Sequence, residues 1–494
     1  MQYISTRNNH PPASPARAIA LGMVPEGGLF VPGELPGQLA RPGEGGSYQA
    51  IAGRILSPLL TDFPADDLSS CIARAYNADS FDTGDIVNVV PLDDRRSVME
   101  LWHGPTAAFK DVALQIMPRL LGTSKKILGD RSRTVILVAT SGDTGKAALE
   151  GFKNREGISI VVFFPHGGVS EVQKLQMTTT DGDNTRVVAV KGNFDECQTE
   201  VKRMLGSSEL RERYRARGVE FSSANSINWG RLCPQIAYYF SSYAALVGRG
   251  TIKDGEAVNY CVPTGNFGNI LAGYYAMRMG LPVGKLICAS NANNVLADFF
   301  ATGRYDSNRV FSRTTSPSMD ILISSNLERF LFEVNGHDAG PVTAWWRSLA
   351  ESGAFTVDAA TRERLDRFIV SGWADEREVL ATIGEEFRRT GYVMDTHTAV
   401  AAAISRRMNP PGGRHTVIAS TASPYKFGTH VLRGMTGEIL DDEFAAIDRI
   451  SALSGVPVHR ALAGLRQKPE RHTRVIEKER MQDTLVELMQ EIAG

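Results

Sequence analysis

The sequence predicts an α/β fold built on mostly parallel sheets, and two observations support this. Short β-branched, apolar runs have the length of buried strands, as in "RTVILVAT" (133–140), "GISIVVFFP" (157–165) and "HTVIAST" (415–421). Segments that read as helices follow such runs, for example "KAALEGFKN" (146–154). Continuous apolar strands that alternate with helices are typical of parallel sheets with crossover helices.

The elements divide the chain into three parts. Residues 1–95 are rich in turns and predict an N-terminal domain of mixed structure. Residues 96–430 carry the alternation, with further strands expected at 185–192, within 257–266 and at 285–291, and helices at 170–180, 194–207 and 269–280. Residues 431–494 predict a helical segment that docks on this core, because one helical face carries Met481, Leu485, Leu488 and Ile492.

Composition excludes several classes of protein. The 494 residues carry a net charge of −1, which gives no electrostatic case for binding nucleic acid or an anionic membrane. No apolar run approaches the roughly 20 residues that span a bilayer, and the N-terminus lacks the apolar region of a secretory signal. The five scattered cysteines favour reduced thiols in the cytoplasm over a disulfide framework or a zinc site, so no metal is expected.

Ligands of open parallel sheets collect beyond the carboxyl ends of strands, which directs attention to three loops. The first, "ATSGDTGKAA" (139–148), is not a nucleotide P-loop, because the glycine required five positions before Gly145 falls on Thr140 and Ala147 replaces the magnesium ligand. Its backbone N–H groups and the hydroxyls of Ser141 and Thr144 suit a carboxylate. A plain strand-to-helix turn with a Ser or Asp cap is an equal alternative.

The other two loops suit a phosphate and a ring. In "PTGNFGNILAG" (263–273), Gly265 and Gly268 allow close backbone approach, and the following helix directs its positive end at a ligand. The pattern is not that of a dinucleotide site and fits one phosphate group. In "ASTASPYKFG" (419–428), the hydroxyl of Thr421 can bond one heteroatom of a bound ring. For each loop, a turn without function stays an alternative.

Lys110 is the candidate nucleophile. It lies in "HGPTAAFKDVALQ", among apolar residues at the expected start of a helix that runs through "KDVALQIMPRLLG". Desolvation and the positive end of a helix both lower the pKa of an amine, and a neutral amine forms Schiff bases with aldehydes. An amine, a phosphate cradle and a ring partner together point to pyridoxal 5′-phosphate. The alternative is a lysine whose stem lines the core while its charge reaches solvent.

Five motifs in this order, "YISTRN" with "GMVPEGGLFVP", "HGPTAAFKD", "ATSGDTG", "PTGNFGN" and "TASPYKF", resemble threonine synthases of the long form. "SINWGRLCPQ" (226–235) fits the same family. The resemblance spans residues 3 to about 430. It implies two open, twisted, mostly parallel sheet domains of pyridoxal-phosphate fold type II, similar to the tryptophan synthase β-subunit, plus an N-terminal domain. It also implies conversion of O-phospho-L-homoserine and water to L-threonine and phosphate.

The resemblance assigns roles residue by residue. Lys110 carries the cofactor and moves the Cα proton, Thr421 meets the pyridine nitrogen, and Arg231 binds the phosphate of the substrate. A planar bidentate donor suits that last task. The cofactor phosphate is held by Gly265, Asn266, Phe267, Gly268 and Asn269, and the substrate carboxylate is received by Ser141, Gly142, Asp143 and Thr144.

Asp143 departs from related enzymes, which often carry Asn near the 3′-oxygen of the cofactor. A carboxylate there repels the phenolate oxygen of the cofactor unless one of the two groups is protonated. Asp143 is therefore alternatively a helix cap. His103 and His397 are expected to pack or cap rather than touch substrate, Lys426 to be solvated, and the ring of Phe267 to fill core. Rival functions are a phospho-lyase of the same fold that releases 2-oxobutanoate, a hydroxy-amino-acid dehydratase, and a binding protein without activity.

Overall fold

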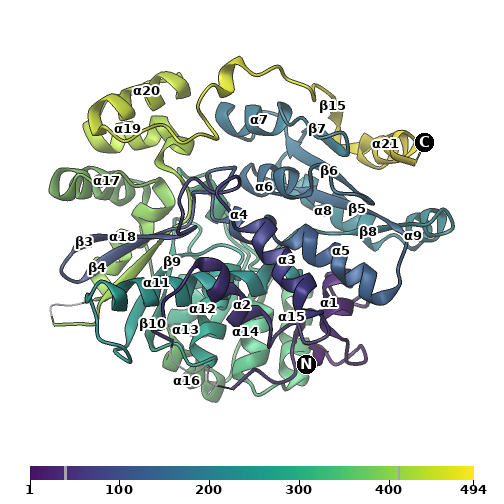
Figure 1. Cartoon of the computed structure of the whole chain (residues 1–494), viewed down its shortest axis with the longest axis horizontal. Helices are drawn as coiled ribbons and strands as arrows, with labels where there is room; N and C mark the ends of the chain where they lie inside the picture. The colour runs from purple at the N-terminus through teal and green to yellow at the C-terminus, as the bar shows by residue number, and fades with distance from the viewer. Residues whose placement is uncertain (38–41, 410–411, 494) are drawn as a thin grey trace.

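Two separate sheets form the centre of the fold in a computed structural model that describes residues 1–37, 42–409 and 412–493. Figure 1 shows them as two lobes, with helices packed around each. Every strand pairing within the smaller sheet is parallel, and in the larger sheet only one pairing is antiparallel. The α/β class with two mostly parallel sheets is thus confirmed.

The smaller sheet has five strands, and three of them match expected strands. Their order is β15 (Val475–Glu477), β7 (Thr185–Lys191), β6 (Ile158–Pro165), β5 (Arg133–Ala139) and β8 (Val219–Ser222). Along β5, Val135 and Leu137 face one core cluster while Ile136 and Val138 face another. Because successive side chains point to opposite faces and both faces are covered, the strand is apolar throughout.

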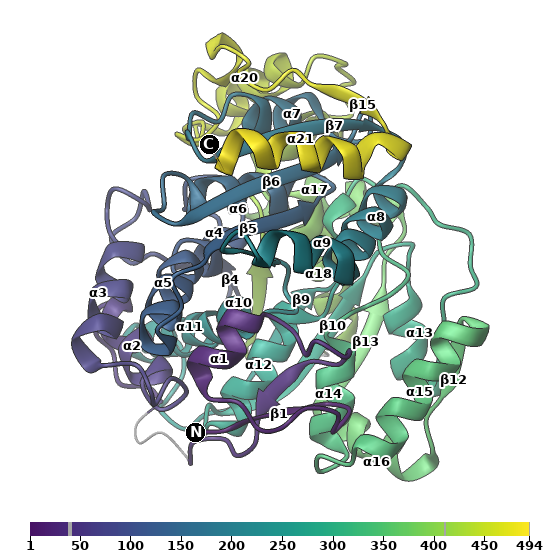
Figure 2. The same ribbon diagram turned by 90° about the vertical axis from the view of Figure 1, so that its right-hand side faces the viewer.

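Helices cover both faces of this sheet. One face packs against α5 (Met117–Leu128), α6 (Asp143–Phe152) and α7 (Glu171–Thr178), and the other against α8 (Phe194–Gly206), α9 (Ser208–Arg215) and α21 (Met481–Ala493). Figure 2 shows α21 lying beside β7 and β6. Met481, Leu485 and Leu488 are buried in that contact, so α21 packs on the smaller sheet.

The larger sheet has six strands. Their order is β13 (Ile369–Trp373), β10 (Val283–Ser290), β9 (Val258–Pro263), β14 (Thr416–Ser420), β4 (Arg96–Glu100) and β3 (Asn88–Asp93), with only β3 antiparallel to its neighbour. The helices around it include α11 (Ile236–Gly248), α12 (Gly268–Arg278) and α13 (Val295–Thr302) on one face, and α17 (Glu376–Thr390), α18 (Thr396–Met408), α19 (Gly428–Thr436) and α20 (Glu443–Ser454) on the other.

The N-terminal segment packs into the same core as the larger sheet. Strands β1 (Tyr3–Ser5) and β2 (Phe30–Pro32) form an antiparallel pair. Helix α1 (Pro15–Leu21) packs on α5, and α2 (Tyr48–Leu56) packs on α11 and on α3 (Ala65–Ala75). The other elements are β11 (Arg304–Asp306), β12 (Ala354–Thr356), α4 (Lys110–Leu114), α10 (Trp229–Leu232), α14 (Leu327–Val334), α15 (Ala339–Ser352) and α16 (Ala359–Phe368), with short 3₁₀ turns η1 (Cys233–Gln235), η2 (Pro317–Met319), η3 (Pro424–Phe427), η4 (Leu465–Gln467) and η5 (Lys478–Arg480).

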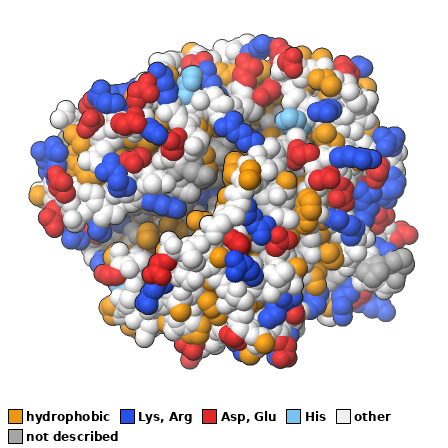
Figure 3. Space-filling view, turned by 180° about the vertical axis from the view of Figure 1, so that it is seen from behind, with side chains coloured by type: hydrophobic (Ala, Val, Ile, Leu, Met, Phe, Trp, Pro, Cys, Tyr) orange, Lys and Arg blue, Asp and Glu red, His pale blue; other side chains and the backbone are white. Residues whose placement is uncertain are grey.

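The surface carries charges of both signs (Figure 3), and the cysteines lie in the interior. Positive and negative side chains are interspersed over the face in Figure 3, with a hollow between its lobes. In the described ranges, no helix combines the length and apolar character needed to cross a membrane. All five cysteines are buried, and each is a free thiol.

The topology of the larger sheet places the loops that follow β4, β14 and β9 side by side. Strands β4, β14 and β9 are neighbours in the sheet, with Glu100 opposite Ser420 and Ile418 opposite Cys261. Because parallel strands end at the same edge, the loops that follow them meet there. These are the loops that carry Lys110, Thr421 and the 264–268 turn. Residue 110 therefore stands at the carboxyl edge of the larger sheet.

Candidate active site

The loop before Lys110 is fixed to the loop that carries Thr421. The N–H of Phe109 donates to the carbonyl oxygen of Thr421 at 2.8 Å, and Ala108 forms a β-bridge with Ala422. Ser423 N–H donates to the carbonyl of Ala107 at 3.0 Å. Two of the predicted site segments are therefore held together by backbone hydrogen bonds.

Asp111 shapes the turn that delivers Lys110. Its buried carboxylate accepts hydrogen bonds from the N–H of Thr106 at 2.8 Å and from the hydroxyl of Thr106 at 2.7 Å. Gly104 lies against the same carboxylate, and a Cβ at that position would stand 2.4 Å from Cβ of Asp111. The glycine, threonine and aspartate of "HGPTAAFKD" are thus needed for one tight, buried loop.

Lys110 begins α4 and is buried, with 8% of its surface exposed. Its Nζ lies 3.5 Å from Oδ2 of Asp143 and 3.4 Å from Oγ of Ser318. Burial lowers the pKa of this amine to about 8; Asp143 opposes the shift, while Arg231 and Lys426 contribute to it. The predicted direction is confirmed, and burial is the main cause. The expected long helix is wrong, because α4 ends at Leu114 and α5 starts separately at Met117.

Asp143 is an ionised carboxylate between two lysines. Burial disfavours its charge, but Lys426 and then Lys110 hold its pKa well below the usual value. Lys426 Nζ lies 2.7 Å from Oδ1, which also accepts from Gln173 Nε2 at 2.9 Å. The cap interpretation of Asp143 is wrong, since the N-cap of α6 is Gly142 and makes no side-chain cap bond. The solvated interpretation of Lys426 is also wrong, since that side chain is fully buried.

The turn at 141–144 offers fewer free groups to a ligand than the sequence suggested. Gly142 has φ of 133°, and a Cβ there would meet Gln173 at 2.5 Å, so only glycine fits. The N–H groups of Gly142 and Gly145 donate to the hydroxyl of Thr140 at 2.9 Å each, so they are not free for a ligand. The partly exposed Ser141 and Thr144 remain as candidate contacts.

The glycine turn at 265–269 is held open by a neighbouring segment. Ser324 Oγ donates to the carbonyl of Gly265 at 2.8 Å, and the N–H and Nδ2 of Asn326 donate to the carbonyl of Asn266 at 3.2 and 3.0 Å. Phe267 has φ of 63°, and its buried ring packs on other phenylalanines, as expected for core. Only its backbone is available to a ligand. Helix α12 then starts at Gly268.

Asn269 carries an unpaired donor at this turn. Its Oδ1 accepts hydrogen bonds from the hydroxyls of Tyr238 at 2.6 Å and Tyr239 at 2.8 Å. These two bonds fix the amide so that Nδ2 is the other group, and in the part of the chain that the structure describes this buried Nδ2 has no hydrogen-bond partner. A buried donor without a partner is costly, and an anionic oxygen at the start of α12 would satisfy it.

Ser318 links the glycine turn with Lys110. Its hydroxyl donates to Asp143 Oδ2 at 3.0 Å and lies near Lys110, while its carbonyl oxygen would stand 3.0 Å from a Cβ at Gly265. The amine of Lys110 and the glycine turn at 265–269 therefore both lie next to Ser318. Ser318 and Gln173 are site residues that sequence reasoning missed, because neither belongs to a recognisable motif.

Arg231 is a buried cation without an acidic partner. It lies on α10, is 5% exposed, and its Nη1 donates to the carbonyl of Ala224 at 2.7 Å. Desolvation alone lowers its pKa to about 10, and within the described ranges no carboxylate pairs with it. Its charge also acts on Lys110. Uncompensated buried charge is expensive, which suits a site for an anion.

The two histidines have structural partners. His397 does not cap α18, because Asp395 is the N-cap; instead its Nε2 accepts from the N–H of Ser318 at 3.1 Å and its Nδ1 lies 2.9 Å from Asp395. His103 is buried between Asp82 and Glu100, 2.7 and 3.0 Å away. His397 thus supports a residue next to Lys110, and His103 packs as expected.

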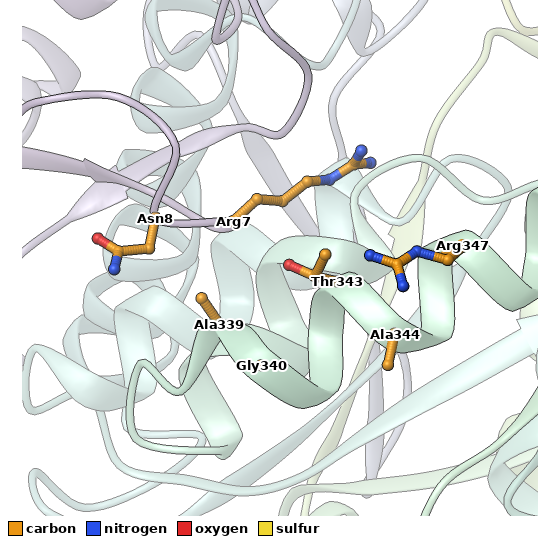
Figure 4. A pocket seen from close by; sticks show the side chains of 7 residues that line it. All are labelled: Arg7, Asn8, Ala339, Gly340, Thr343, Ala344 and Arg347. Carbon is orange, nitrogen blue, oxygen red and sulfur yellow. The ribbon is translucent and has the colours of Figure 1, made fainter.

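A separate surface cavity of about 410 Å³ lies elsewhere, between the N-terminal segment and α15 (Figure 4). Arg7 and Asn8 border it on one side and Thr343 and Arg347 on the other. None of its lining residues belongs to the cluster around Lys110, so the buried chemistry and this cavity are distinct features.

Comparisons with known proteins match this geometry. The family profile "Threonine synthase N terminus" matches residues 2–76, and "Pyridoxal-phosphate dependent enzyme" matches residues 98–421. Threonine synthase from Pseudomonas aeruginosa is 37% identical over 447 residues, which cover 89% of this chain and 91% of that protein. The chain belongs to the threonine synthase family of pyridoxal-phosphate-dependent enzymes.

Two further comparisons frame this membership. The crystal structure of pyridoxal-phosphate-bound threonine synthase from Brucella melitensis superposes with a TM-score of 0.85 at 36% identity, covering 100% of this chain and 98% of that one. The human protein threonine synthase-like 1 is 39% identical over 468 residues, which cover 90% of this chain. The chain spans 62% of the length of that relative.

Pyridoxal 5′-phosphate is the cofactor, and the residues present fit it. Lys110 offers a buried amine with a lowered pKa for the aldehyde. The Nδ2 of Asn269 and the start of α12, where the N-cap residue makes no side-chain cap bond, suit the phosphate. Thr421, bonded to the loop of Lys110, suits the ring.

Proposed function

We propose that the protein is a threonine synthase that converts O-phospho-L-homoserine and water to L-threonine and phosphate. The observation that carries the proposal is the pairing of a nucleophilic amine with a lone guanidinium. Lys110 and Arg231 are both buried and interact electrostatically, and no carboxylate among the described residues pairs with Arg231. A substrate that brings both an amine for the cofactor and a dianionic phosphate for an arginine matches this pair.

Lys110 has two tasks in this proposal. It first holds the cofactor through its amine nitrogen. When the amino group of the substrate displaces it, the freed amine accepts the Cα proton and later returns it, since a pKa of about 8 lets it work in both directions near neutral pH. When bound, the cofactor would withdraw electrons from the substrate. Protons could then leave Cα and Cβ and phosphate could leave Cγ; a proton returned to Cγ, water added at Cβ and a proton returned to Cα would complete threonine.

Other residues bind and orient. Gly265, Asn266, Phe267, Gly268 and Asn269 hold the cofactor phosphate, mostly through backbone N–H groups and Asn269 Nδ2. Thr421 presents a hydroxyl to the pyridine nitrogen. Arg231 binds the phosphate of the substrate, and Ser141 and Thr144 at the turn with Gly142 and Asp143 receive its carboxylate. We place the enzyme in the cytoplasm, since its five buried cysteines are free thiols.

The test supplies O-phospho-L-homoserine to the purified protein and quantifies threonine, phosphate and 2-oxobutanoate. Equal amounts of threonine and phosphate are expected. Phosphate with 2-oxobutanoate instead of threonine would identify the phospho-lyase, because both reactions share their early steps. No phosphate release from a protein that retains its cofactor would refute both. Lys110→Ala is expected to abolish product formation and the visible absorbance of the bound cofactor.

A further inference from the structure

Lys426 is the second amine of the site and is the more deeply buried one. It lies in η3, has no exposed surface, and is held by the carbonyl of Thr106 at 3.1 Å and by Oδ1 of Asp143 at 2.7 Å. Lys110 approaches the other oxygen, Oδ2, at the longer distance of 3.5 Å. A single carboxylate thus serves two ammonium groups, and Lys426 holds it more closely.

This arrangement matters because the two lysines need different protonation states. An amine bonds to an aldehyde only when it is neutral. A lone buried carboxylate beside Lys110 would stabilise its protonated form and oppose bonding. Burial, Arg231 and Lys426 act in the opposite direction and leave the amine with a pKa of about 8.

We propose that Lys426 is a positioning residue that takes up the charge of Asp143, so that Lys110 can lose its proton and bond to the cofactor. In that step the amine nitrogen adds to the aldehyde carbon, a carbon–nitrogen double bond forms, and the carbonyl oxygen leaves as water. The Asp143–Lys426 pair stays behind as a neutral unit. This explains how the site accommodates the buried carboxylate of Asp143 beside Lys110.

The charged surroundings support this division of roles. Lys110 faces Asp143 from α6, Arg231 from α10 and Lys426 from η3. Lys426 also acts on Asp111. Burial raises the pKa of Asp111 to about 6, and the charge of Lys426 opposes that rise. Gln173 Nε2 donates to the oxygen of Asp143 that pairs with Lys426, which keeps the other oxygen turned toward Lys110.

The test measures cofactor attachment rather than turnover. The purified protein is freed of cofactor with hydroxylamine and supplied with pyridoxal 5′-phosphate, and the rate at which visible absorbance returns is followed against pH. The wild-type rate is expected to rise toward a midpoint near the pKa of Lys110, about 8. Lys426→Met is expected to move this midpoint upward, and each unit slows attachment at neutral pH about tenfold.

Three further variants make the outcome decisive. Asp143→Asn is expected to lower the midpoint, and adding it to Lys426→Met is expected to bring the midpoint below wild type, because Asp143 acts on Lys110 more strongly than Lys426 does. Lys146→Met is the matched control: this buried lysine lies on α6 but pairs with Glu150 at 2.5 Å and not with the site. It is expected to leave the midpoint unchanged.

The inference depends on the proposed role of Lys110, and the two can fail separately. Attachment that survives Lys110→Ala at every pH would remove the role of Lys110. Attachment that is lost in Lys110→Ala while Lys426→Met keeps the wild-type midpoint would overturn the role of Lys426 alone. Circular dichroism checks that each variant is folded, and if Lys426→Met is not, Lys426→Gln takes its place: a midpoint that is not raised above the wild-type value refutes the inference.

Discussion

Replacing Arg329 by methionine is expected to weaken both the fold and the cofactor site, because this arginine joins three separate segments. It lies on α14 with no exposed surface. Its Nε donates to the carbonyl of Phe30 at 2.9 Å, its Nη1 to Oδ1 of Asn326 at 2.6 Å, and its Nη2 to the carbonyl of Ile227 at 2.5 Å. Asn326 in turn holds the carbonyl of Asn266 in the glycine turn.

The magnitude follows from the acceptors left without a donor. Two of them, the carbonyl of Phe30 and Oδ1 of Asn326, are in fully buried contacts. An unsatisfied buried acceptor costs about 1–3 kcal/mol, so losing the donor to both acceptors is expected to lower the free energy of unfolding by about 2–6 kcal/mol. Removing a buried charge, which burial already disfavours in Arg329, moves the result toward the lower end.

The assay compares urea-induced unfolding and the dissociation constant of pyridoxal 5′-phosphate for wild type and Arg329→Met. A lower unfolding free energy and about tenfold weaker cofactor binding are expected, since about 1.4 kcal/mol at the turn corresponds to a factor of ten. Arg362→Met is the control, because Arg362 is partly exposed and its loss should cost less than about 1 kcal/mol. A loss below 1 kcal/mol in Arg329→Met with unchanged cofactor affinity would refute the reasoning.

Further substitutions test individual parts of the account. Arg231→Ala is expected to raise the KM for O-phospho-L-homoserine about ten- to a hundredfold while the cofactor absorbance persists, and an unchanged KM would remove Arg231 from the site. Asn269→Leu should weaken cofactor affinity about tenfold in a binding titration, and wild-type affinity would contradict its role. Gly142→Ala should cost about 1–3 kcal/mol of unfolding free energy, since φ is 133° there. Leu485→Ala should cost about 2–5 kcal/mol, and a smaller loss would mean that α21 contributes little.

The sequence predicted six of the parallel strands, β5, β6, β7, β9, β10 and β14, because burial on both faces produces continuous apolar runs. It missed β4, which is buried but includes the charged residues Arg96 and Glu100. Strand β5 is buried from Thr134 to Ala139, so its apolar run is continuous. The short edge strands β8, β13 and β15 carry no comparable run. Edge strands are partly exposed, as Val475 in β15 is, so their residues need not all be apolar. The proposed boundaries at residues 95 and 430 stay a prediction, although residues before 95 pack into the core of the larger sheet.

At the site, the sequence indicated residues in motifs and missed residues that reach it through tertiary packing. Lys110 was accessible to reasoning because apolar neighbours imply burial. Lys426 was misjudged as solvated, since nothing within "SPYKF" reveals that Asp143 lies against it. Ser318 is 208 residues from Lys110 in the chain, and only the fold brings its hydroxyl to the amine.

The central claim is that Lys110 bonds covalently to the cofactor. Reduction of the purified protein with sodium borohydride would fix that bond, and mass spectrometry of its peptides would locate the label. The account predicts a phosphopyridoxyl group on Lys110 alone. A label on another lysine, Lys426 above all, or a cofactor-loaded protein that gains no label, would contradict it.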